Sequence, residues 1–432
     1  MAGIRVVVGA VVLLSMLLGL SHAACPGSPN TLPIFDDEPK HVRSVENGKL
    51  FSIDHGNGKS MRILHVYGTP YQMGKAQGEI FTKEIYDMIT AFSGYIDSQI
   101  EPYIKWLPKE IQEIILKDGP QAALQFEVDL TRKYIPQHFF DELKGIADGM
   151  NGTMSYDEIL QFHLFPELIK ASCSMFGAWG PALANTSDTL NQLRALDWGI
   201  DNPLINYSVV VVYHPNDGNG HAFASLTWTG FIGSITAYGG HTAVSEKVWL
   251  SYNETYARAG IPFHFLMRDI AQYDRTLSDA LNRVYNNRRT CSIHLGVGSR
   301  HDQQFRAVEY GHEEVLVYDD LNYPTYLPAH PQMDGLVFIN KHVQPSHDTC
   351  MGSLMQKHYG NLTAETTIRN VLGNTQSGDM HAAVYNFEKN HMYVSVAGPK
   401  VTSSGDVEST VTPAYARPWF KLDMTKLFAQ QQ

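Results

Sequence analysis

The spacing of apolar residues predicts helices in the first third of the chain. Over residues 71–168 they recur at intervals of three and four, as in Ile85, Met88, Ile89 and Phe92. That spacing places them on one helical face. Prolines at 108, 120 and 136 interrupt the run, so we expect several separate helices.

The pattern changes near Cys173, where short alternating or apolar runs typical of strands take over. Two sets of strands with helices between them favour an α+β fold, in which helices cover sheets in one globular unit, over a doubly wound fold. We expect strands at 191–198, 207–214, 221–228, 232–238, 242–249, 292–298, 305–310, 314–318 and 336–339, helices at 262–273, 277–285 and 364–372, and a final hairpin at 381–397.

Glycines at 68, 74 and 78 lie within a single short stretch that follows a predicted strand at 61–67. Residues without side chains allow close backbone approach. We therefore predict a turn that leads into a helix packed tightly against a neighbour.

The N-terminus resembles a cleaved secretory signal. Arg5 precedes the apolar run 6–20, and small residues follow at 21–24. This order is typical of a signal peptide, so we assign residues 1–24 to one and expect a secreted or lysosomal protein. Five glycosylation sequons are predicted to lie on the surface: Asn151, Asn185, Asn206, Asn253 and Asn361.

The chain has four cysteines, too few for a disulfide scaffold at this length. We expect a disulfide between Cys25 and Cys350, tying the mature N-terminus to the late chain. Cys173 and Cys291 then either pair or leave at least one free thiol. A free thiol in an oxidising compartment is either well buried or chemically used.

Charge and motifs exclude several functions. The net charge is -11 and no basic stripe occurs, so we expect no nucleic-acid partner. No phosphate-binding glycine loop, nucleophile elbow or zinc-binding helix motif is present. We therefore expect a reaction that uses no cofactor and no metal.

The best candidate chemistry surrounds Cys173, where the helical part gives way to strands. Arg194 and Asp197 follow on the next predicted strand. A hairpin would bring that strand beside Cys173. Because residues three apart on a flat strand face opposite sides, placing both beside the thiol requires a strand end or a bulge.

These motifs resemble the cysteine N-terminal-nucleophile hydrolases, which include acid ceramidase, N-acylethanolamine acid amidase, penicillin V acylase and the bile salt hydrolases, and the related penicillin acyltransferases. The resemblance rests on Cys173, on the Arg-x-x-Asp-aromatic run 194–198, on the glycine stretch 68–78, on the strand that ends at Asn340 and on the closing hairpin. It implies a four-layer αββα sandwich.

The resemblance also implies a mechanism. Cys173 cuts the chain before itself, giving a mostly helical α chain, residues 25–172, and a catalytic β chain, residues 173–432. The freed α-amine then serves as the base for the thiol. Asp197 would hold this amine, Arg194 would favour the thiolate, and Asn340 would donate to the oxyanion.

The implied activity is hydrolysis of a linear amide through an acyl-thioester on Cys173. The partner is then a small-molecule or lipid amide, with an N-acylated lipid as one candidate and peripheral contact with lipid as a further expectation. An acyltransferase, a phospholipase-type esterase and a non-catalytic secreted glycoprotein are the alternatives. The sequence departs from its relatives at 242–247, where several carry an Asn, and after Asn340, where the expected Arg is missing.

Overall fold

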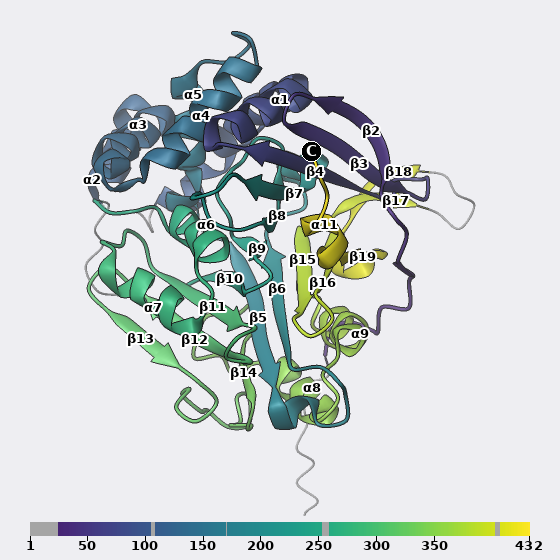
Figure 1. The fold of residues 1–432 in the computed structure, drawn as a ribbon. Coiled ribbons are helices and arrows are strands. Elements are labelled where there is room, and N and C mark those ends of the chain that lie inside the picture. The colour runs from purple at the N-terminus through teal and green to yellow at the C-terminus, as the bar shows by residue number, and fades with distance from the viewer. Residues whose placement is uncertain (1–24, 105–108, 170, 253–258, 402–406) are drawn as a thin grey trace, which may run out of the picture.

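The structure is a computed structural model that describes residues 25–104, 109–169, 171–252, 259–401 and 407–432 (Figure 1). The predicted signal peptide and the sequon at Asn253 lie outside these ranges. Two large sheets form its centre. None of the described helices is long and apolar enough to span a membrane.

The seven-stranded sheet carries the two strands that matter most for the site, β5 and β6, at adjacent positions. Its order is β1 (Ile34–Phe35), β19 (Trp419–Asp423), β16 (His391–Val396), β15 (His381–Asn386), β6 (Leu190–Asp197), β5 (Ser172–Trp179) and β14 (Leu336–Ile339).

The ten-stranded sheet combines three strands from the N-terminal part of the chain with seven from its middle. Its order is β13 (Val315–Tyr318), β12 (Gln304–Tyr310), β11 (Ile293–Ser299), β10 (Thr242–Val248), β9 (Thr236–Tyr238), β8 (Phe223–Trp228), β7 (Ser208–Pro215), β4 (Ser60–Gly68), β3 (Gly48–Asp54) and β2 (Lys40–Val45). A separate hairpin joins β17 (Gly398–Val401) and β18 (Val407–Thr412).

Helices cover the outer face of each sheet. The ten-stranded sheet packs against α1 (Pro70–Ile104), α4 (Gln137–Gly149), α5 (Tyr156–His163), α6 (Phe263–Tyr273) and α7 (Leu277–Asn286). The seven-stranded sheet packs against α8 (Cys350–His358) and the helical run formed by α9 (Ala364–Thr366), η5 (Thr367–Leu372) and α10 (Gly373–Thr375). Peripheral helices are α2 (Lys109–Asp118), α3 (Pro120–Thr131) and α11 (Met424–Phe428).

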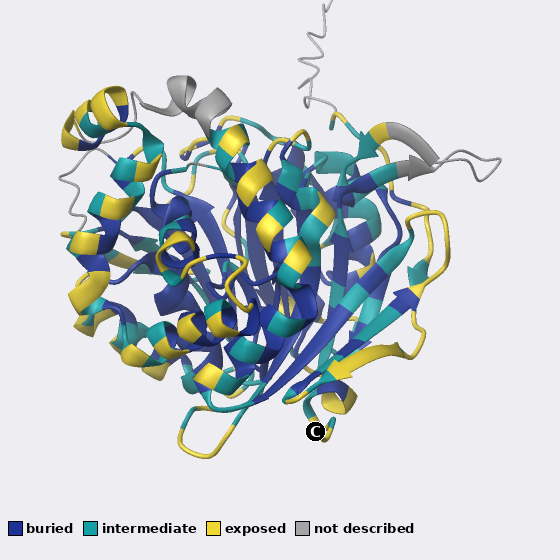
Figure 2. Ribbon diagram, turned by 90° about the horizontal axis from the view of Figure 1, so that it is seen from above, coloured by how far each residue is buried: buried dark blue, intermediate teal, exposed yellow. Residues whose placement is uncertain are grey.

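Three apolar cores hold these layers together. One lies between the outer helices and the ten-stranded sheet, one between the two sheets, and one between the seven-stranded sheet and α8. Figure 2 shows the buried strands at the centre and the exposed positions on the outer helices. The predicted α+β, four-layer αββα architecture is confirmed by this helix–sheet–sheet–helix order.

The glycine stretch packs as predicted. A Cβ on Gly74 would lie 1.9 Å from the carbonyl oxygen of Glu142 in α4, and one on Gly78 would lie 2.3 Å from that of Ile146. Gly145 of α4 meets the Tyr71 carbonyl in the same way, at 2.1 Å. The backbones of α1 and α4 therefore touch along a seam that only glycine allows.

Several elements lie outside the predicted ranges, among them the β2–β3 hairpin and helix α8. Residues 40–54, for which we predicted no element, form the hairpin. Its loop residues are Glu46 and Asn47, and Asn47 adopts φ 61°, a conformation that Asn tolerates better than most residues. Helix α8 was not predicted, although Met351, Leu354 and Met355 show the spacing of its buried face.

Candidate active site

Cys173 is the second residue of β5 and is fully buried. It lies directly opposite Leu196 of β6, and Met175 lies opposite Arg194. Because side chains alternate along a strand, Cys173 and Arg194 share one face of the sheet. Met175 belongs to the core between the two sheets, so this face turns toward the ten-stranded sheet.

Arg194 joins Cys173 to an acid on the opposite sheet. Its Nη1 donates to Cys173 Sγ at 3.3 Å and its Nη2 donates to Glu246 Oε2 at 3.2 Å. The thiol donates to the same Glu246 oxygen at 3.8 Å. A third bond, from Arg194 Nε to the Ile235 carbonyl at 3.1 Å, fixes the guanidinium. These contacts form a closed triangle of thiol, cation and carboxylate.

Burial governs the proton affinities in this triangle. It raises the pKa of the Cys173 thiol to about 12, a shift that Arg194 opposes and Glu246 reinforces. It also raises the pKa of Glu246, again against the pull of Arg194. In the uncut chain the thiol is therefore protonated near neutral pH, with a carboxylate of increased basicity beside it.

Asp197 lies on the other face of the seven-stranded sheet. The β5–β6 register runs without a bulge from Ser172↔Asp197 to Trp179↔Leu190. Its carboxylate accepts from Ser377 Oγ at 2.5 Å and from the Gly378 amide at 2.9 Å. Arg194 and Asp197 therefore do not meet, and the bulge that would have brought both beside the thiol does not occur.

Asp197 is nevertheless next to the predicted cleavage point. It lies directly across from Ser172, whose carbonyl would be cut. Burial raises the pKa of Asp197 to about 6, with Lys341 opposing this shift and Asp379 adding to it. A buried carboxyl at this position, when ionised, is placed to pair with the α-amine that cleavage before Cys173 would release.

Asn340 follows β14, the strand paired with β5. Its amide nitrogen donates to Ser346 Oγ at 3.1 Å, and its oxygen accepts from Gln344 Nε2 at 2.8 Å and from the His342 amide at 3.1 Å. Within the described chain these bonds turn its side chain into the following loop, so its donation to an oxyanion stays a prediction.

The sequence analysis assigned no role to Glu246, Lys247 or Ser377, which the structure brings to the site. Lys247 is buried, donates from Nζ to the Lys341 carbonyl at 3.0 Å and interacts electrostatically with Cys173. Ser377 Oγ also lies 2.7 Å from Ser174 Oγ, whose hydroxyl can donate to it, and this contact links Asp197 to β5. The only signal was positional, because Glu246 and Lys247 lie in the segment 242–247, where the sequence departs from the pattern that it resembles.

An apolar pocket, here called the Cys173 pocket, adjoins the triangle. Glu246 lines it together with Leu196, the residue paired with Cys173. The other lining residues are Phe165, Pro166, Ile169, Ala171, Trp198, Trp228, Phe231, Ile235, Val248 and Phe263. Glu246 Oε1 has no hydrogen-bond partner among the described residues. An apolar ligand with one polar donor suits this lining.

The remaining predicted site residues fall as follows. Cys25 and Cys350 form the expected disulfide, with an S–S distance of 2.06 Å. Cys173 is a free thiol, and Cys291 is half-buried. Of the four described sequon asparagines, Asn151, Asn185, Asn206 and Asn361, all are exposed. No group of three metal-ligating side chains converges in the described ranges.

Two proteins of Dictyostelium discoideum resemble this chain over nearly its whole length. Protein dcd1A is 42% identical over 422 residues, 94% of this chain and 94% of its own. The chain belongs to the dcd1 family. Protein dcd1B of the same organism is 41% identical over 92% of this chain and 81% of its own.

A more distant relative of this dcd1-family chain occurs in Archaeoglobus fulgidus. This uncharacterized protein is 24% identical over an alignment that covers 66% of the chain and 50% of the Archaeoglobus protein. No protein-family model matches.

Solved structures similar to this dcd1-family chain are distant. A Caenorhabditis elegans ortholog of N-acylethanolamine-hydrolyzing acid amidase is 15% identical over 50% of this chain and 93% of its own, with a TM-score of 0.36. A penicillin V acylase from Agrobacterium tumefaciens is 10% identical over 59% of this chain and 87% of its own, with a TM-score of 0.38.

Proposed function

We propose that this protein is a secreted or lysosomal, self-processing cysteine amidase that cleaves a linear amide, such as an N-acylated lipid, through an acyl-thioester on Cys173. The observation that carries the proposal is the Cys173–Arg194–Glu246 triangle at the start of β5, beside an apolar pocket. Contacts of a free thiol with both a cation and a carboxylate support a nucleophilic role.

The first step is cleavage of the chain. Glu246 takes the thiol proton, and Cys173 Sγ attacks the Ser172 carbonyl carbon. The bond from this carbon to the Cys173 nitrogen breaks as Glu246 returns the proton to that nitrogen, which leaves Ser172 joined to Cys173 Sγ as a thioester. Water then hydrolyses the thioester, leaving a carboxylate on Ser172 and an α-amine on Cys173. Asp197, opposite Ser172, stabilises the new ammonium when it is ionised.

The second step acts on the substrate. The α-amine accepts the thiol proton, and the thiolate, stabilised by Arg194, attacks the amide carbon. The leaving amine takes the proton and departs, and water hydrolyses the acyl-thioester. Glu246 Oε1 accepts the substrate N–H, a donor that an ester lacks, and this favours an amide over an ester.

The pocket supports an apolar acyl group. Its lining is aromatic and aliphatic apart from Glu246, so burial of apolar surface would contribute most of the binding free energy. Ile169 and Ala171 line it and lie on the N-terminal side of the scissile bond, so cleavage removes their covalent connection to Cys173.

Secretion is supported by the N-terminal pattern, the exposed sequons and the Cys25–Cys350 disulfide, a bond typical of oxidising compartments. This disulfide would also join the two chains after cleavage, since Cys25 precedes the scissile bond and Cys350 follows it.

The test is the chain pattern of the purified, deglycosylated protein with N-terminal sequencing. At 48.3 kDa for 432 residues, cleavage leaves pieces of roughly 17 and 29 kDa. They separate only after reduction. A new N-terminus at Cys173 that disappears in Cys173→Ala but persists in Cys291→Ala supports the proposal. A single uncut chain after acid incubation contradicts it and favours a binding glycoprotein. Matched amide and ester substrates, with and without an acceptor amine, then separate amidase, esterase and acyltransferase.

A further inference from the structure

Lys247 of β10 is a buried cation at the same end of the sheet as the candidate nucleophile. The residue is 1% exposed, and its Nζ donates to the Lys341 carbonyl at 3.0 Å. Lys341 belongs to the segment that follows β14, the neighbour of β5. Because β14 ends at Ile339, opposite Met175, this segment leaves β14 at the end of β5 that carries Cys173. The Lys247 ammonium therefore lies at the end of β5 where the thiol lies.

Two adjacent residues of β10 approach the thiol from different sides. Glu246 contacts Arg194 of β6, and Lys247 contacts the segment after β14. In the seven-stranded sheet, β5 lies between β6 and β14. Cys173 of β5 is therefore flanked by a carboxylate on one side and by an ammonium on the other.

Lys247 differs from two other buried cations in having no acidic partner. Arg194 pairs with Glu246 at 3.2 Å. Arg268 pairs with Glu142 at 2.6 Å. Lys247 forms no ion pair within the described chain, and its single hydrogen bond leaves two of its three N–H groups free to donate. Because lysines are almost never fully buried unless paired, these free donors point to a ligand oxygen as their partner.

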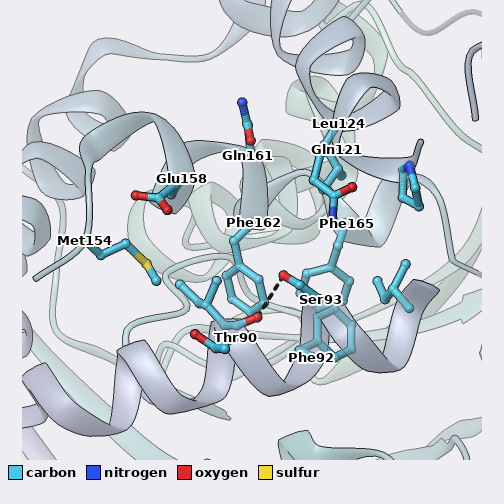
Figure 3. A pocket seen from close by; sticks show the side chains of 13 residues that line it. Thr90, Phe92, Ser93, Gln121, Leu124, Met154, Glu158, Gln161, Phe162 and Phe165 are labelled. Atoms are coloured by element: carbon cyan, nitrogen blue, oxygen red, sulfur yellow. Dashed lines mark hydrogen bonds between the residues drawn. The ribbon is translucent and has the colours of Figure 1, made fainter. Parts of the chain in front are cut away.

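A second apolar pocket, between α1, α3 and α5, shows how polar groups are satisfied elsewhere. In this pocket, drawn in Figure 3, Ser93 Oγ donates to the Ile89 carbonyl at 2.8 Å, shown dashed, and Gln161 donates to Gln125 at 2.8 Å. No lysine or arginine lines it. A buried cation with donors to spare therefore distinguishes the surroundings of Cys173 from this pocket.

The charges around Lys247 favour its protonated form. Burial lowers the pKa of its ammonium, whereas Cys173, Glu246 and Asp197 raise it. His294 lies directly opposite on β11, where burial and the Lys247 charge lower its pKa to about 3. His294 is therefore neutral near neutral pH and adds no competing positive charge. Negative charge that develops beside Cys173 is stabilised by the ammonium.

We propose that Lys247 is a catalytic residue that donates a charged hydrogen bond to the carbonyl oxygen of the amide attacked by Cys173. As Sγ adds to the carbonyl carbon, this oxygen becomes negative, and the ammonium binds it without giving up a proton. The C–N bond then breaks, the C=O bond re-forms, and Lys247 is unchanged. This role rests on the proposed amidase function. It does not depend on Asn340, whose amide nitrogen donates to Ser346.

The test compares two reactions of Cys173 in the purified full-length protein. p-Nitrophenyl acetate acylates the sulfur through an oxyanion, whereas iodoacetamide alkylates it at a saturated carbon and forms none. Lys247→Met should lower the acylation rate by about 10²–10³ and the alkylation rate by less than about tenfold, since alkylation needs only the thiolate. Peptide masses locate each label, because Cys291 is a second thiol.

Further variants separate charge from structure. Lys247→Arg keeps a cation and should recover part of the acylation rate. Lys247→Gln keeps a neutral donor, should fall between the other two, and serves as the test if Lys247→Met does not fold. Unfolding is recognised by faster alkylation, because it exposes the thiol. Lys144→Met, at an exposed cation of α4, is the matched control and should react as the wild type does.

Three outcomes decide between the proposals. Equal losses of acylation and alkylation in Lys247→Met, or an unchanged acylation rate, would overturn the oxyanion role. A wild-type protein that stays uncut, yet loses Cys173 acylation on substitution of Lys247, would refute the self-processing amidase and retain the oxyanion role. Absence of acylation at Cys173 of the wild type would overturn both.

Discussion

The guanidinium of Arg194 donates a hydrogen bond to the sulfur of Cys173 across 3.3 Å, from the strand next to it. The same guanidinium is paired with Glu246 of the facing sheet. The contact therefore connects the two sheets at the candidate nucleophile, so the chemistry and the stability of the site depend on the same buried cation.

Removing that cation is expected to destabilise the uncut protein. In Arg194→Met, Glu246 stays buried without its partner, and breaking a buried ion pair in this way costs about 3–5 kcal/mol. The measurement is urea unfolding in a Cys173→Ala background, so that both proteins stay uncut. Lys83→Met, which removes the cation of an exposed pair with Asp87, should change the free energy of unfolding by less than about 1 kcal/mol. If both substitutions changed the free energy of unfolding equally, the buried Arg194–Glu246 pair would be no more important for stability than the exposed Lys83–Asp87 pair.

Glu246 is expected to be needed for self-cleavage. A general base contributes roughly 10²–10⁴ in rate, so Glu246→Gln should slow the appearance of the new N-terminus by about that factor. Glu246→Asp keeps a carboxylate and should recover part of the rate, which a merely structural defect would not do. Glu388→Gln, at an exposed acid, is the control. If Glu246→Gln cleaved itself at the wild-type rate, the Glu246 carboxylate would not be the base for self-cleavage.

Asp197 is expected to make stability fall as pH rises. Burial raises the pKa of its carboxyl from 3.8 to about 6. Between these values the folded chain holds a proton that the unfolded chain has lost. The free energy of unfolding therefore drops by about 3 kcal/mol as pH rises through that window, and Asp197→Asn should flatten the drop. Unfolding titrations between about pH 4 and pH 7 in the Cys173→Ala background test this. Asp118→Asn, at an exposed residue, should keep the slope. An unchanged slope in Asp197→Asn would assign the pH dependence to another group.

The seam between α1 and α4 offers a test of packing. Gly74→Ala places a methyl group on the Glu142 carbonyl, and overpacking of this kind costs about 1–3 kcal/mol or more because backbone cannot move aside as a side chain can. Gly94→Ala, in the same helix, meets nothing within 4 Å and should be neutral or stabilising by up to about 1 kcal/mol. Thermal unfolding compares the two, and a smaller loss for Gly74 than for Gly94 would refute the close contact.

Much of the fold followed from local pattern. The strands around the site begin and end within a few residues of the predicted ranges, because alternation and turn residues are properties of short segments. The α1–α4 seam was also readable, since glycines at regular helical spacing have few other uses. The Cys25–Cys350 disulfide was predicted as a bond that ties the mature N-terminus to the late chain, and the structure contains it.

What the sequence determined was the nucleophile candidate and its neighbours along β5 and β6, which a hairpin brings together by local pairing. What only the tertiary structure decided was the partner on the other sheet. Glu246 lies 73 residues from Cys173 in sequence, and only the stacking of two sheets makes them neighbours. The strand register likewise separated Arg194 from Asp197, because side chains three apart on a regular strand point to opposite faces.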